Sequence, residues 1–185
     1  MIGISVLPEP SRDLGLFLKV LLSECSFLER TGRPCAYFGF SSKSDFRIKP
    51  VVFRIGQPKF VEFDAHLIGY AKVKLHALYE NQHFLTTYDM DGQDLHSHGV
   101  FVLGGGLSLP SNYVSVAAFP REWDEAMAYL FGCYLEASAL GIPTREWLSE
   151  PFETNFGLFQ DSRVSELVAE RGVLAKVLSV MREKF

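Results

Sequence analysis

The spacing of apolar residues changes twice along this chain. After Ser11, a good helix N-cap, apolar residues recur at helical spacing as far as Leu28. From Val51 to Phe119 the dominant spacing is two residues, which is typical of strands. From Pro120 onward helical spacing returns. Because strands grouped between helices tend to pack as separate layers, this order predicts an α+β fold with an N-terminal helix.

The predicted sheet is an antiparallel meander of about six or seven strands, with C-terminal helices packed on one face. The clearest alternation runs from Tyr70 to Glu80, where Ala71 and Val73 face the core and Lys74 faces the other side. Such alternation is typical of a half-buried antiparallel strand. Further strands are expected at residues 35–41, 51–55, 59–64 and 113–119.

Helices account for the rest of the chain. Pro120 precedes a predicted helix that Gly141 and Pro143 end, and Thr144 opens a short one. Residues 161–181 carry the apolar stripe of a terminal helix. No repeat or linker interrupts the sequence, so residues 1–185 are expected to form one domain, with a helix-plus-sheet part (1–119) and a helical part (120–185).

The polar segment from His83 to Gly106 contains the residues that suggest chemistry. Asp91-Gly92 favours a two-residue hairpin turn, since both central positions of a type I′ turn need positive φ. Histidines two positions apart on a strand share a face and can chelate one metal ion. The candidate ligands for Zn, Fe or Mn on that face are Asp89, Asp94, His96 and His98.

The spacing Gly92-x3-His96-x-His98 resembles part of the first cupin motif. It lacks the glutamate that follows in that motif, and nothing downstream resembles the second cupin motif, so the cupin function is not carried over. A metal here would imply a small metal-dependent hydrolase or oxygenase. The alternative is a polar face on which histidines relieve repulsion between carboxylates.

The run Gly104–Gly106 is not followed by Lys or Thr, which favours a turn between strands over a phosphate-binding loop.

The net charge and the cysteine residues limit the classes of protein to which this chain can belong. The net charge of −4 argues against nonspecific binding to nucleic acid or to anionic membranes. The N-terminus lacks the pattern of a signal peptide, and the longest uncharged helical run, Ala126–Leu135, is half of what a bilayer requires. Cys25, Cys35 and Cys133 have no metal-binding spacing, so reduced, buried thiols and a cytoplasmic location are expected.

The C-terminal third is both acidic and aromatic. Between Arg121 and Asp161 there are two basic and eight acidic residues, a balance of −6. Carboxylates around aromatic anchors are typical of a specific interface, although helix packing on the sheet explains the same aromatic residues. The leading hypothesis is a non-enzymatic domain that binds another, basic protein, as inhibitors, immunity proteins and secretion chaperones do. Such a domain needs no cofactor. The sequence leaves the oligomeric state open. The predicted contact residues are Glu122, Trp123, Asp124, Glu125, Trp147, Glu150 and Glu153.

Overall fold

The computed structural model describes residues 7–45, 50–58, 61–90, 104–149, 164, 167–169 and 172–185. In this part of the chain, four strands form one antiparallel sheet in the order β2-β1-β4-β3. The strands are β1 (Cys35–Ser42), β2 (Val51–Gly56), β3 (Gly106–Ser108) and β4 (Asn112–Ala117). The α+β class predicted from the sequence is therefore confirmed, but the described sheet has four strands rather than six or seven.

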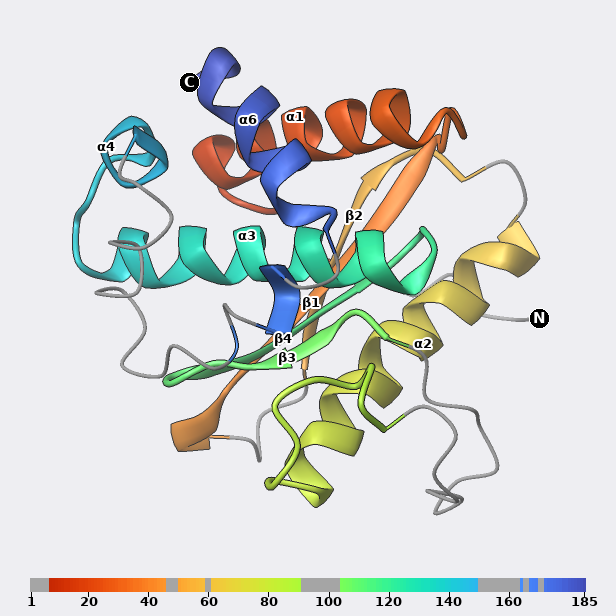
Figure 1. Ribbon diagram of the computed structural model, residues 1–185. Helices are drawn as coiled ribbons and strands as arrows, with labels where there is room; N and C mark the ends of the chain where they lie inside the picture. Colours follow the sequence, from red (N-terminus) through yellow and green to blue (C-terminus); the bar gives the residue numbers. More distant parts are fainter. Residues whose placement is uncertain are drawn as a thin grey trace.

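Helices cover both faces of the sheet (Figure 1). One face packs against α2 alone, and the other packs against α1 and α3, with α6 lying on α1. The C-terminal helices lie on one face, as predicted, whereas α2, in a segment predicted to form strands, covers the other face. The helices are α1 (Arg12–Glu29), α2 (Val61–Glu80), α3 (Arg121–Ala139), α4 (Thr144–Ser149) and α6 (Leu174–Lys184), and a short 3-10 helix, η1 (Lys43–Asp45), follows β1. None of the helices within the described residues is long and apolar enough to cross a bilayer.

The ends of α1 and α3 agree with the signals in the sequence. The Ser11 hydroxyl accepts a hydrogen bond from the Leu14 amide at 3.4 Å, which satisfies one of the unpaired donors of the first turn of α1. Pro120 is the N-cap of α3, and Gly141 follows its end with a φ of +71°. Capping chemistry is local, so the sequence alone is sufficient to predict these boundaries.

The region from Val61 to Glu80 differs from its prediction, because it forms helix α2 rather than strands. Residues at every second position also include pairs four apart, so Ala71 and Leu75 fit both a strand and a helix face. The structure buries Ile68, Ala71, Leu75 and Leu78, which are three or four residues apart, and leaves Tyr79 at 43% exposure. The helical period therefore decides which residues this segment buries.

Side chains alternate between two cores across the sheet. Phe38, Ile55 and Val114 point into the larger core, beneath α1 and α3. Tyr37, which precedes Phe38, and Val52, which lies three residues before Ile55, point into a smaller core beneath α2. Every described strand except the short β3 thus contributes to two packed layers, which explains why β1 is almost continuously buried.

The two edges of the sheet are protected differently. The outer edge of β3 pairs with residues 85–87, since the Thr87 amide donates to Gly106 O at 2.9 Å and the Ser108 amide donates to Leu85 O at 2.8 Å. On the opposite edge, β2 pairs with β1 on one side only, within the described residues. The segment from Leu7 to Ser11 passes this edge, and its two prolines lack the N–H that would extend a sheet.

Candidate functional site

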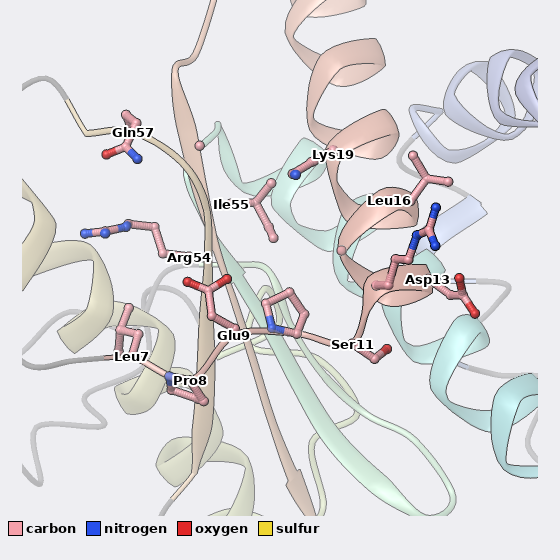
Figure 2. Close-up of a pocket in the computed structure, with 14 residues that line it drawn as sticks. Leu7, Pro8, Glu9, Ser11, Asp13, Leu16, Lys19, Arg54, Ile55 and Gln57 are labelled. Carbon is pink, nitrogen blue, oxygen red and sulfur yellow. The ribbon is translucent and has the colours of Figure 1, made fainter.

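A groove of about 890 Å³ lies between the segment Leu7–Ser11, the first half of α1 and the end of β2 (Figure 2). Leu7 packs against the core beneath α2, whereas Ser11 starts α1 on the other side of the sheet, so the segment must pass around the outer edge of β2. The groove exists because Pro8 and Pro10 keep this passage extended instead of pairing it with the strand.

The groove combines an apolar floor with charges of both signs. Ile55 and Gly15 are buried at its base, and Leu16, which is 56% exposed, forms part of the wall. Figure 2 shows Lys19 extending from α1 toward Ile55. The charged residues that line the groove are Glu9, Arg12, Asp13, Lys19 and Arg54. This mixture suits the binding of a polypeptide, which offers apolar and charged side chains together.

Arg54 is held in place by a polar cluster beneath α2. Its guanidinium lies 3.1 Å from the Asp64 carboxylate, which also accepts a hydrogen bond from the Tyr37 hydroxyl. Burial, with the hydrogen bond to Asp64, raises the pKa of Tyr37. By contrast, Arg12 and Lys19 form no ion pair within the described residues and are exposed, so they are available to an incoming carboxylate.

A second polar cluster lies inside the protein, between α2, β4 and α3. The Lys74 ammonium, 3% exposed, lies 3.1 Å from Asp124 Oδ2 and also donates to Val116 O. Asp124 accepts further hydrogen bonds from the Ala118 amide at 3.1 Å and the Phe119 amide at 2.9 Å. Burial raises the pKa of Asp124 to about 6, although Lys74 and these amides oppose the rise. Because the pair is enclosed, it anchors elements rather than contacting a ligand.

The glycine run 104–106 packs directly over this cluster. A Cβ at Gly105 would lie 3.0 Å from Lys74 Nζ and would contact Asp124, and the residue has a φ of +100°. A Cβ at Gly104 would lie 2.6 Å from that of Arg121. Because these glycines lack side chains, the chain can pack closely on Lys74. This close packing explains the glycine run without a phosphate-binding role.

The thiols are in the interior, as the sequence predicts. Cys25, Cys35 and Cys133 are all buried and reduced. Burial raises the pKa of each thiol, most strongly for Cys25 and Cys133. Since the thiolate is the nucleophile, burial of this kind disfavours covalent chemistry at any of the three.

The predicted metal site lies mostly outside the described residues. Asp94, His96 and His98 are not among them, whereas Asp89 is half-buried in the turn before residue 91. The part of the chain that the structure describes holds no group of three or more His, Cys, Asp or Glu side chains that could bind a metal ion. The metal site therefore stays a prediction.

Some of the residues predicted to contact a partner are buried, and others are partly exposed. Asp124 (4% exposed) and Glu125 (0%) are buried, because the first turn of α3 inserts into the fold and Glu125 accepts a hydrogen bond from Thr86. Trp147 is also buried and packs on Phe17, with ring centroids 5.9 Å apart. These three side chains are packed inside the fold. Glu122 and Trp123 are partly exposed, and Glu150 and Glu153 lie outside the described residues.

Sequence reasoning missed Lys74 and the groove. The strand that the alternation predicts places Lys74 on the side away from the core, and the groove joins residues that are about forty positions apart in the sequence. The double proline before a capped helix was the available signal for the groove. A scan against protein-family models and searches of curated proteins and of solved structures found no match to this chain.

Proposed function

We propose that this chain is a protein-binding domain and that a partner polypeptide docks in the groove beside β2. The observation that carries the proposal is the composition of the groove wall, where the exposed Leu16 stands among side chains of both charges. Interfaces of this kind use an apolar anchor with charged groups around it. The proposal keeps the class of function predicted from the sequence but moves the contact surface from α3 to α1 and β2.

The charges indicate the chemistry of the partner. Arg12 and Lys19 on α1 suit an acidic side chain, while Glu9 on the crossing segment suits a basic one. Ile55 and Leu16 between them suit an apolar residue. A segment carrying acidic, apolar and basic side chains in that order would match the groove along its length.

Site-specific photo-crosslinking tests this proposal. A photoreactive amino acid at Gln57, at the mouth of the groove, should crosslink to the partner in cell extract, whereas the same residue at exposed Lys72 on α2 should not. With the captured partner purified, Glu9→Lys should weaken binding by about tenfold, which corresponds to about 1.4 kcal/mol. The matched variant Glu146→Lys on α4 should leave binding unchanged. Equal crosslinking from both positions, or equal affinity of both lysine variants, would exclude the groove as the contact surface.

A further inference from the structure

The outer edge of β2 carries backbone groups that the described sheet does not use. The amide of Gln57, directly after β2, donates to Pro34 O, directly before β1, at 3.2 Å, so residue 57 points its N–H toward β1. In an antiparallel ladder, residues that point their N–H and C=O groups toward the neighbouring strand alternate with residues that point them away. Arg54 and Gly56, three and one residues before Gln57, therefore point these groups to the outer side.

The groove exposes this part of the edge. Its lining includes residues 54–57, which leave room for about 10 Å of an added extended chain, or about four residues. On this side β2 has no neighbouring strand within the described residues, and no backbone hydrogen bond among them joins Leu7–Ser11 to β2. The outward N–H and C=O groups of Arg54 and Gly56 therefore face the groove without a backbone partner in the described part of the chain.

An extended polypeptide is the occupant that these groups fit. A helix uses its N–H and C=O groups internally, so it has few to offer to the edge of a sheet. An extended segment presents such groups on both sides and can continue the ladder at the usual strand spacing of about 4.8 Å. With this segment bound, β2 would have a strand on each side, as β1 and β4 have in the described sheet.

The side chains near the edge indicate what the segment carries. Ile55 points toward the face covered by α1, whereas Arg54 points toward α2, where its guanidinium lies 3.1 Å from Asp64. A residue of the segment beside Ile55 therefore also faces α1, where Lys19 extends toward Ile55 (Figure 2). Because Lys19 and Arg12 are exposed and form no ion pair within the described residues, an apolar residue beside Ile55 with a carboxylate two positions away suits this wall.

We propose that the partner polypeptide binds by strand addition. An extended segment of the partner, with apolar and acidic side chains on the side that faces α1, pairs its backbone with Arg54 and Gly56 and becomes a fifth strand beside the four described ones. This inference rests on the proposed function, because it names the conformation and the backbone contacts of the partner in the same groove. Main-chain hydrogen bonds then supply affinity, and alternate side chains of the segment supply specificity.

Hydrogen exchange of the free protein tests whether the edge is open. In the isotopically labelled full chain, followed by NMR, the amides of Phe53 and Ile55 point toward β1 and should be protected. The amides of Arg54 and Gly56 point outward and should exchange faster by roughly tenfold or more. Equally slow exchange at all four amides would mean that the chain itself or a second copy already pairs with the edge, and would overturn the proposal.

Peptides selected on the full chain from a random phage-displayed library test the bound state. A peptide that loses about tenfold in affinity with Glu9→Lys, but not with the control Glu146→Lys, occupies the groove. Its binding should slow the exchange of the Arg54 and Gly56 amides and leave that of the Ile55 amide unchanged. N-Methylation of the peptide backbone should weaken binding by about tenfold or more at alternate positions only, because alternate amides of a strand face its neighbour.

The outcomes separate strand addition from the proposed function. Peptides that depend on Glu9, but neither protect the Arg54 and Gly56 amides nor show the alternating effect of N-methylation, would overturn strand addition and leave the groove as the contact surface. If every selected peptide binds Glu9→Lys as tightly as the wild type, both strand addition in the groove and the proposed function are contradicted.

Discussion

Lys74 and Asp124 start from helices on opposite faces of the sheet and meet at the end of β4, where the Lys74 ammonium lies 3.1 Å from Asp124 Oδ2. Both side chains are almost fully buried. The Lys74 ammonium also donates to Val116 O, so the pair connects α2, β4 and α3 at one point. This contact fixes how the two helical layers sit relative to the sheet.

The ion pair leads to a prediction about stability. Lys74→Met should lower the free energy of unfolding by about 3–5 kcal/mol, because it leaves the Asp124 carboxylate buried without its cation. The double variant Lys74→Met with Asp124→Asn should lose less, since no unpaired charge remains and the Asn oxygen can still accept from the Ala118 and Phe119 amides. Urea unfolding followed by circular dichroism measures both. A single variant that is more stable than the double variant would contradict the prediction.

The raised pKa of Asp124 makes a prediction about pH. The pKa lies at about 6 in the folded protein, against an ordinary value of 3.8, so between these values the folded state binds more protons than the unfolded state. The contribution of Asp124 to the free energy of unfolding is therefore largest below the ordinary value, falls as pH rises, and levels off above about 6. The full change is on the order of 3 kcal/mol.

Unfolding curves of the wild type and of Asp124→Asn, recorded between about pH 4 and pH 7, isolate this contribution. The wild type should lose stability relative to the variant as pH rises through that range. A relative gain by the wild type would show instead that Lys74 lowers the pKa of Asp124 by more than burial raises it.

The packing of Gly105 predicts a steric effect. Gly105→Ala should destabilise the protein by about 3 kcal/mol or more, because the added methyl group contacts Asp124 and Lys74 and the backbone φ of +100° is strained for alanine. Gly141→Ala is a matched control, since Gly141 also has a positive φ, +71°, but nothing lies within 4 Å of its Cβ position. Gly141→Ala should lower the free energy of unfolding by about 1 kcal/mol. Equal losses in thermal or urea unfolding would mean that backbone strain alone explains the glycine.

The start of α1 predicts a smaller effect. Ser11→Ala should cost about 1 kcal/mol, because the Leu14 amide loses the hydroxyl that caps it. Ser23→Ala, in the exposed middle of the same helix, should be neutral or slightly stabilising, because alanine has the higher helix propensity. Chemical unfolding of the two variants compares them directly, and a Ser11→Ala protein as stable as Ser23→Ala would show that the cap contributes nothing.

Local signals in the sequence were sufficient to predict α1, α3 and three of the strands. Ser11, Pro120 and Gly141 act within a turn of the residues they cap, so their effect does not depend on the rest of the fold. The strands at 35–42, 51–56 and 112–117 lie close to their predicted bounds, because alternation and flanking turns are also local. The α+β class followed from the order of these elements.

Tertiary structure decided the form of α2, the layering of the helices and the groove. Residues 61–80 fit two periods, and only burial against β1 and β4 selects the helix. A lysine in that segment is expected to face water, but Asp124, fifty residues later, makes a buried position acceptable for Lys74. The groove likewise needs Leu7–Ser11 to pass the edge of β2. Such contacts join distant residues, and a pattern read along the chain contains no information about which distant residues will meet.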